Sequence, residues 1–428
     1  ATPTKNDGDT IMRERSGPGA GSAMPGNGSA VVTTIRAARQ PHVVHATECL
    51  AGGTLGLLVA AIHELNALGV AQTLVYARRD DTPEDVAGQF PPTLRLIEVP
   101  RARGDHLAFI AGLSRELRRL VGRGDADVVH LHSSKAGFVG RLALLATMMP
   151  VRVVYSPHGL AFLNPRRPLA SAAYFSLEWL AGRTRFDPVA CGESEAMALS
   201  RVCRREPFVL ENPVDPAFFA VSRSEQPTPL VVTIGRVCEQ KAPEVFAELA
   251  VRTRVDHPGA QFVWVGSGNG ADGRDGCALL RAAQVNVTGW VSPAEVRQWL
   301  ARATLYVQTS RWEGLPLSVI QAQAVGLPCV VTDVVGNRDA VIDGETGFVA
   351  ASVDELAAHI DLLLREPALR RAVSGPARAA AERRFGRARF RQTLALLYGL
   401  AGSSPSPRLE RPDSLRPAAV KSARLATG

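Results

Sequence analysis

The chain has 428 residues, enough for about two domains, and its composition (46% hydrophobic, 21% charged) is that of a globular protein. A net charge of +8 favours an acidic partner, such as a phosphorylated substrate or anionic lipid, without choosing among them. The cysteines lack the spacing of zinc ligands or redox pairs, and a chain of this length needs no disulfide scaffold. We therefore expect scattered thiols in a reducing compartment, at positions 49, 191, 203, 238, 277 and 329.

Both ends of the chain are rich in Gly, Ser and Pro. We interpret residues 1–40 as a disordered leader and residues 401–428 as a disordered basic tail. Residues 1–39 contain no continuous apolar run like that of a secretory signal, and no stretch reaches the ~18 apolar residues needed to cross a bilayer. These features predict a cytoplasmic protein, with peripheral attachment to the inner membrane left open.

Between the ends, short apolar runs alternate with amphipathic segments. In the first half the predicted strands are "HVVHAT", "QTLVYA", "DVVHLHS" and "RVVYSPHG", with helices after Gly52-Gly53 and from about Lys135. After a polar linker at 220–229, the second half gives "LVVTIGRV", "QFVWVG", "NVTGW", "TLYVQTS" and "PCVVTD", again separated by helices. This alternation predicts an α/β protein with two doubly wound, Rossmann-like domains, residues 41–219 and 220–400, that face a central cleft.

Several chemically suggestive residues follow predicted strands, where ligands of parallel sheets bind. Gly52 and Gly53 open a helix whose N-terminus can hold a phosphate, although a tight turn without a ligand fits equally well. His158, in "YSPHGLAF", lies between a proline and a glycine that shape its turn. Arg236 and Lys241, after Gly235 in "TIGRVCEQK", could clamp a diphosphate.

Two other patterns favour simpler interpretations. "VWVGSGNGA" fits a dinucleotide fingerprint through Gly266, Gly268 and Ala271, but no acidic residue follows at the end of the next strand, so a turn lining a nucleotide site is favoured. The arginines of "SRELRRLVGRG" indicate a solvated helix face or a surface for anionic lipid. With 6% aromatic residues and no nucleic-acid motif, nucleic-acid binding is not expected.

Taken together, these motifs resemble glycosyltransferase family 4, the retaining enzymes of the GT-B fold. The resemblance runs from about His42 to about Leu400 through five motifs in the family's order. It is carried by "VVHLHSSKAGFVGR", "SPHGLAF", "NPVD", "GRVCEQKAPE" and "SRWEGLPLSVIQAQAVGLPCVVTD". The first two are most similar to the subgroup that builds capsules and exopolysaccharides. The resemblance also implies that the last helices return to the N-terminal domain, which would hold the acceptor while the C-terminal domain holds the nucleotide sugar.

The resemblance assigns four catalytic residues: Glu313 and His158 beside the transferred sugar, and Arg236 and Lys241 on the donor's diphosphate. It assigns the rest of the site to substrate binding, namely Gly52, Gly53, Gly235, Gly266, Trp290, Val291, Gly314, Leu315, Pro316, Leu317 and Gln321. Gln321 stands where the family has its second glutamate, eight residues after Glu313. An amide still offers hydrogen bonds to a ribose, so we expect altered donor affinity rather than a lost reaction.

The implied reaction moves a hexosyl unit from a UDP- or GDP-sugar to a glycan or lipid-linked glycan. Cationic side chains can stabilise the leaving diphosphate, so no metal or other cofactor is expected. A retaining glycosidase would need two close carboxylates; none is evident, which favours front-face attack. Two alternatives remain open: a catalytically degenerate sugar-nucleotide-binding scaffold, suggested by Gln321, and a nucleotide-sugar epimerase, for which acids placed to abstract protons are not apparent. The donor, acceptor and linkage do not follow from the sequence.

Overall fold

The computed structural model describes residues 41–100, 106–145, 147, 150–224, 226–268 and 270–400. The leader predicted at 1–40 and the tail predicted at 401–428 lie outside these residues. Among the described residues, no helix combines the length and apolarity needed to span a bilayer.

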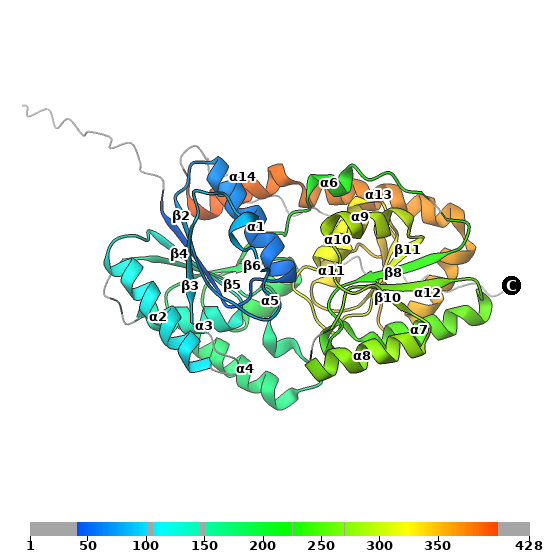
Figure 1. Cartoon of the computed structure of the whole chain (residues 1–428), viewed down its shortest axis with the longest axis horizontal. Coiled ribbons are helices and arrows are strands. Elements are labelled where there is room, and N and C mark those ends of the chain that lie inside the picture. The colour runs from blue at the N-terminus through cyan, green and yellow to red at the C-terminus, as the bar shows by residue number, and fades with distance from the viewer. Residues whose placement is uncertain are drawn as a thin grey trace, which may run out of the picture. The chain divides into compact units, whose positions relative to one another are not determined.

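A parallel sheet of seven strands forms the core of the first half, in the order β3-β2-β1-β4-β5-β6-β7 (Figure 1). Strands β1, β2, β4 and most of β5 are fully buried because helices cover both faces. The strands are β1 (Val43–Thr47), β2 (Gln72–Ala77), β3 (Arg95–Val99), β4 (Val128–His132), β5 (Arg152–Ser156), β6 (Asp187–Ala190) and β7 (Phe208–Val209).

Helices from both ends of the chain cover this sheet. One face packs against α2 (His106–Gly122), α3 (Ser134–Leu145) and α5 (Glu193–Ser200). The other packs against α1 (Gly52–Ala67) and α14 (Arg387–Tyr398), the last helix described (Figure 1). Helix α4 (Pro168–Ala181) lies outside α3, and the short helices η1 (Ala87–Gln89) and η2 (Ala161–Leu163) lie in connections.

The second half is built on a parallel sheet of six strands, in the order β10-β9-β8-β11-β12-β13. Its strands are β8 (Leu230–Ile234), β9 (Gln261–Val265), β10 (Asn286–Val287), β11 (Leu305–Gln308), β12 (Cys329–Thr332) and β13 (Gly347–Ala350). One face is covered by α7 (Pro243–Asp256), α8 (Gly270–Ala282) and α12 (Val353–Arg365). The other is covered by α6 (Pro216–Phe219), α9 (Pro293–Arg302), α10 (Leu317–Ala324), α11 (Asn337–Ala340) and α13 (Pro367–Phe385).

Local sequence explains where several helices begin. Helix α9 starts with a capping box, in which the Ser292 hydroxyl accepts from the Glu295 N–H and the Glu295 carboxylate accepts from the Ser292 N–H. Helix α12 is capped by the Ser352 hydroxyl in the same position. Between α13 and α14 the chain changes partner: Phe385 packs in the core of the second sheet, whereas Phe390 packs against the first.

The predicted α/β class and its two doubly wound sheets are confirmed, and every strand named from the sequence is present. The described residues between Ala220 and Pro229 form no helix or strand, as expected of a linker. The domain boundary itself stays a prediction. The sequence pattern did not reveal β3, β6, β7, β13 or helix α4.

Helix α4 is anchored by a buried ion pair. Of its residues, only Glu178 and Ala181 are buried. The Glu178 carboxylate accepts from Arg141 Nη2 at 2.6 Å and from the Tyr155 hydroxyl at 2.7 Å. The Arg141 guanidinium lies over the Tyr155 ring, 4.1 Å from its centroid, and its side chain is fully buried. One charged contact therefore fastens an otherwise exposed helix to α3.

We expect Glu178→Gln to lower the free energy of unfolding by about 3–5 kcal/mol, because it leaves the buried Arg141 charge without a counterion. Urea unfolding would measure this. The control is Glu248→Gln, which breaks an exposed ion pair with Arg252 on α7 and should leave the free energy of unfolding almost unchanged, because water screens exposed charges. Equal losses in the two variants would contradict the anchoring role.

Candidate active site

Loops at the carboxyl ends of strands from both sheets touch each other. Gly159 follows β5 and Cys191 follows β6, while Gly314 lies between β11 and α10. A Cβ added to Gly314 would stand 2.9 Å from both the Cys191 sulfur and the Gly159 nitrogen. Only glycine permits this approach, so residue 314 brings the loop of Glu313 against the loop of His158.

Polar contacts reinforce the approach. The Ser194 hydroxyl donates to the Asp339 carboxylate at 2.6 Å and accepts from the Gly336 N–H at 2.9 Å. The Asn212 amide donates to the Leu315 carbonyl at 2.8 Å. All these groups are buried, which makes each contact costly to break.

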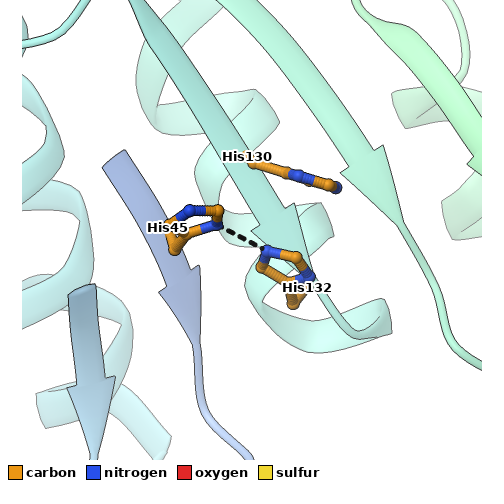
Figure 2. A group of neighbouring side chains, drawn as sticks. All are labelled: His45, His130 and His132. Atoms are coloured by element: carbon orange, nitrogen blue, oxygen red, sulfur yellow. Dashed lines mark hydrogen bonds between the residues drawn. The ribbon is translucent and has the colours of Figure 1, made fainter. Parts of the chain in front are cut away.

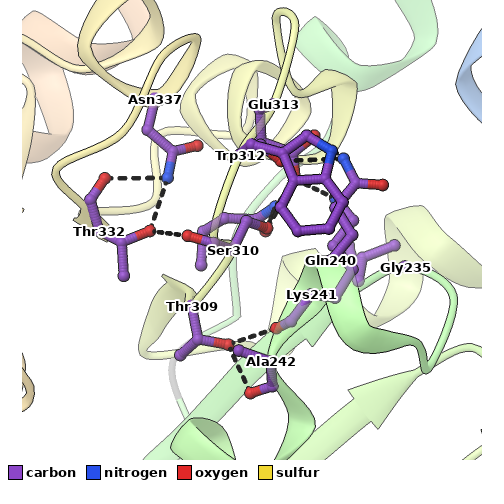
Figure 3. Close-up of polar contacts among 12 residues, drawn as sticks. Gly235, Gln240, Lys241, Ala242, Thr309, Ser310, Trp312, Glu313, Thr332 and Asn337 are labelled. Atoms are coloured by element: carbon purple, nitrogen blue, oxygen red, sulfur yellow. Dashed lines mark hydrogen bonds and ion pairs between the residues drawn. The ribbon is translucent and has the colours of Figure 1, made fainter. Parts of the chain in front are cut away.

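The Glu313 carboxylate is the centre of a dense hydrogen-bond network (Figure 3). Its Oε1 atom accepts from Lys241 Nζ at 2.6 Å, from the Ser310 hydroxyl at 2.6 Å and from the Gln308 amide at 3.0 Å. Gln240 donates to Oε2 at 3.4 Å. Glu313 is 7% exposed, and its carboxylate is held in one orientation by side chains that follow β8 and by side chains at the carboxyl end of β11.

The backbone holds Lys241 in place as well. Lys241 ends the short helix η3 (Glu239–Lys241), and the next residue, Ala242, adopts the left-handed conformation with φ 49°. That conformation costs a non-glycine residue about 1–3 kcal/mol. The Thr309 hydroxyl donates to the Lys241 carbonyl at 2.8 Å and thereby supports the turn (Figure 3).

Arg236 differs from Lys241, because its side chain is exposed and has no hydrogen-bond or ion-pair partner among the described residues. It lies near Cys49, in the loop after β1. Burial raises the pKa of the Cys49 thiol, and the positive charge of Arg236 acts in the opposite direction. The two cations predicted to hold a diphosphate thus lie after β8, one fixed by Glu313 and one free to turn toward a ligand.

Two helix N-termini lie side by side at this edge. Gly52, with φ 53°, begins α1, and Leu317 begins α10. A Cβ added to Gly53 would meet the Leu317 side chain at 3.6 Å, so the first turn of α1 touches the first residue of α10. The unpaired N–H groups of both first turns favour an anion. Pro316 is the buried residue that precedes α10.

The other residues predicted to bind substrate are Gly235 after β8, Gly266 after β9, Trp290 and Val291 after β10, and Gln321 on α10. A Cβ on Gly266 would clash with the Gly235 carbonyl at 2.1 Å, so these two glycines let the ends of β8 and β9 pack together. Trp290 is 56% exposed, and Val291 packs partly against the second core. Among the described residues, no hydrogen bond joins Trp290 or Val291 to the side chains around Glu313. The Gln321 side chain is half-buried on α10 and makes no hydrogen bond to the described residues.

His158 occupies the turn after β5. It is half-buried and left-handed, with φ 54°, and Gly159 beside it has φ 107°. The Glu195 carboxylate accepts from the Gly159 N–H at 2.7 Å and from the Cys191 N–H at 2.8 Å. Burial raises the pKa of Glu195 and raises that of Cys191 well above its usual value. Glu195 therefore holds the turn of His158 in place through its backbone hydrogen bonds.

Sequence reasoning missed Glu195, Asp339 and Gln308, which position the predicted residues without standing in a recognisable motif. The only signal for Glu195 was its place in "CGESE", directly after a strand. It also missed that His158 is hydrogen-bonded to a second, buried histidine: His132 Nδ1 lies 2.9 Å from His158 Nε2.

Both halves of the chain match known protein families. Residues 51–218 match the family model "Glycosyltransferase Family 4", and residues 228–366 match "Glycosyl transferases group 1". The chain is 28% identical over 274 residues to UDP-Gal:alpha-D-GlcNAc-diphosphoundecaprenol alpha-1,3-galactosyltransferase of Escherichia coli, covering 58% of this chain and 68% of the relative.

Solved structures share the architecture. Sucrose-phosphate synthase from Thermosynechococcus elongatus superposes with a TM-score of 0.73 at 17% identity, over 84% of this chain and 98% of that one. Anabaena HepE, solved in complex with UDP and glucose, gives 0.69 at 16% identity, over 84% and 100%. The fold is therefore GT-B, as predicted. Since the two family models together match most of the described residues, the chain belongs to the family 4 glycosyltransferases.

Proposed function

We propose that this glycosyltransferase moves a hexosyl unit, with retention of configuration and without a metal, from a UDP- or GDP-sugar to a glycan or lipid-linked glycan acceptor in surface polysaccharide synthesis. The observation that carries the proposal is the Glu313–Lys241 contact, at 2.6 Å, at the entrance to α10. It presents a fixed cation beside two helix N-termini. The relative from E. coli is named for a UDP-sugar donor and a diphosphoundecaprenol acceptor, which supports the donor and acceptor classes.

In this proposal the protein's own cations stabilise the leaving diphosphate, so no metal is needed. Cleavage of a sugar–diphosphate bond builds negative charge on the diphosphate, and preorganised cations and N–H groups stabilise it. Lys241, Arg236 and the first turns of α1 and α10 can provide that stabilisation. Among the described residues, the only cluster of three potential metal ligands is a group of buried histidines, rather than the acids that would bind Mg²⁺.

The carboxylates near the site favour front-face attack over a covalent intermediate. Glu313 Oε1 already accepts from three side chains, and the oxygens of Glu195 accept from the backbone of Gly159 and Cys191. A carboxylate occupied in this way is a poor nucleophile. We therefore assign the departing phosphate as the base for the acceptor hydroxyl.

Purified protein given radiolabelled UDP- and GDP-sugars with a lipid-linked acceptor should transfer sugar from one of them, undiminished by EDTA. NMR of the product should show the donor's anomeric configuration. Lys241→Met and Glu313→Ala should each lower kcat by about 100-fold or more, whereas Glu345→Ala, an exposed acid, should not. Donor binding without turnover in the unaltered protein would instead support the scaffold alternative, and an inverted product would refute retention.

Gln321 offers a test of the ribose contact. If its amide bonds a donor hydroxyl, Gln321→Glu should change the donor's KM about 3- to 10-fold while kcat stays within about twofold. Steady-state kinetics with varied donor would separate the two constants. Unchanged KM and kcat would remove the basis for this contact, and a large change in kcat alone would assign the residue to the chemical step.

We also propose that helix α4 attaches the enzyme to the membrane surface where a lipid-linked acceptor would be found. Its exposed large apolar side chains are Leu169, Tyr174, Phe175, Leu177, Trp179 and Leu180, and Leu169 is 88% exposed. Helices α2, α3 and α4 pack side by side (Figure 1). The predicted basic residues Arg115 and Arg118 are exposed on α2, and Arg123 is exposed directly after it. Apolar side chains next to cations suit an anionic interface.

Co-sedimentation with phosphatidylglycerol-containing vesicles should show binding that phosphatidylcholine vesicles do not reproduce. The double variant Leu169→Ser/Leu180→Ser should weaken binding about tenfold, through lost apolar burial. A matched control is Val251→Ser/Val255→Ser, which changes two exposed apolar residues on α7. Equal binding by both double variants would rule out α4 as the contact.

A further inference from the structure

Four histidines of the first sheet form a group inside the protein, and the sequence assigned a role to only one of them, His158. His45 is on β1, His130 and His132 are on β4, and His158 follows β5. The first three are buried, and Figure 2 shows the hydrogen bond that joins His45 to His132. Only His158 reaches the candidate site.

Three of these rings form a continuous hydrogen-bonded chain that ends at an amide. His158 Nε2 lies 2.9 Å from His132 Nδ1, and His132 Nε2 lies 3.1 Å from His45 Nδ1. His45 Nε2 lies 3.3 Å from the Gln72 Oε1 atom, and Gln72 Nε2 donates to the Ile62 carbonyl at 3.0 Å. The chain therefore runs from the site through the sheet to helix α1.

The amide at the inner end sets the direction of every bond. A carbonyl can only accept, so Gln72 must turn its NH₂ to Ile62 and its oxygen to His45. His45 then carries its proton on Nε2 and accepts at Nδ1. It follows that His132 donates from Nε2 and accepts at Nδ1.

Because His132 Nδ1 is an acceptor, the bond to His158 fixes the tautomer of His158 as well. Its proton is on Nε2 and is donated to His132, which leaves a lone pair on Nδ1. No described residue donates to that Nδ1 atom. Burial keeps the rings neutral: it lowers the pKa of His45 and of His158 to about 4, and that of His132 well below its usual value. A neutral chain has one defined direction, whereas a protonated ring would donate both ways.

We propose that Gln72, His45 and His132 are positioning residues that hold His158 as the Nε2-protonated tautomer, so that its Nδ1 accepts a hydrogen bond from a hydroxyl of the sugar substrate. This inference rests on the proposed function for the identity of the hydroxyl. The direction of the chain in the free protein does not depend on it.

The same rings suit a metal ion less well. Candidate ligand atoms of His45, His130 and His132 lie within 4.8 Å of one another (Figure 2). However, His45 Nδ1 and His132 Nε2 face each other, and His130 bonds the Tyr398 hydroxyl at 2.6 Å and the Ser156 hydroxyl at 2.8 Å. A metal would have to break these bonds, and the cluster contains no carboxylate or thiolate to balance its charge.

The decisive experiment is ¹⁵N NMR of the histidine rings in the ligand-free protein, since a protonated and a bare ring nitrogen have distinct shifts. The unaltered protein should show His158 with a bare Nδ1 and a protonated Nε2. Gln72→Met removes the acceptor of His45 and permits the whole chain to reverse, so the Nδ1-protonated form of His158 should appear. His158 in a mixture of tautomers before substitution would overturn the proposal.

Tyr398→Phe is the matched control, because it removes a polar contact from His130 in the same pocket while leaving the chain intact. It should not alter the His158 signals. Should Gln72→Met fail to fold, His132→Phe retains a ring but removes the acceptor of His158, and should release its tautomer in the same way. If Tyr398→Phe changed the His158 signals as much as Gln72→Met or His132→Phe, the change would come from altered packing and the proposal would be wrong.

Activity gives the second measurement. Gln72→Met and His132→Phe should lower kcat/KM about tenfold, the value of one lost hydrogen bond, although neither residue touches substrate. Altered tautomers with unchanged kcat/KM would overturn the role of Nδ1 as acceptor. If no sugar is transferred by any form, the proposed function fails while the NMR result still stands. Stoichiometric zinc uptake that shifts the His45 and His132 signals would overturn the chain in favour of a metal site.

Discussion

The approach of Gly314 to Gly159 is the constraint on which the candidate site depends. A Cβ at Gly314 would collide with the loop of Gly159, and Gly159 itself has a φ of 107° that favours glycine. The contact brings Glu313 and His158 from different sheets into one place. The groups behind each loop are then arranged to hold it still: Lys241, Ser310 and Gln308 on the Glu313 carboxylate, and the Glu195 carboxylate on the backbone of Gly159. Preorganisation of this kind is how an enzyme stabilises charge that appears only during the reaction.

Strain and buried polarity are concentrated at the same edge of the sheets. Three non-glycine residues with left-handed backbone, Ser133, His158 and Ala242, follow β4, β5 and η3. Such conformations persist only where surrounding contacts enforce them, and here hydrogen bonds from Thr309 and to Glu195 support two of these turns. The stability lost there is recovered in the apolar layers on both faces of each sheet.

The sequence allowed the architecture and the motif residues to be predicted, because both depend on local patterns. Buried strands such as β5 and β8 are short apolar runs; Gly235 directly follows β8, and His158 comes two residues after the end of β5. The edge strands β7 and β13 are short and only partly buried, and the sequence pattern did not reveal them. Glu195 and the chain from Gln72 to His158 were out of reach, since their contacts depend on β1 pairing with β2 and β4. Helix α4 is apolar yet exposed, which no pattern distinguishes from a buried helix.

The place of α14 has a consequence for how the protein is made. Its residues Phe390, Leu394, Leu397 and Tyr398, with Leu400 just after it, complete a core whose remaining buried members lie between Val43 and Leu210. The Tyr398 hydroxyl bonds His130 across 268 positions of sequence. During synthesis, the first sheet emerges from the ribosome long before the helix that covers one of its faces. Until α14 has been synthesised, the part of that face beneath it stays open to water and to other nascent chains. The strands of the first sheet can therefore pair before α14 is available to pack against them.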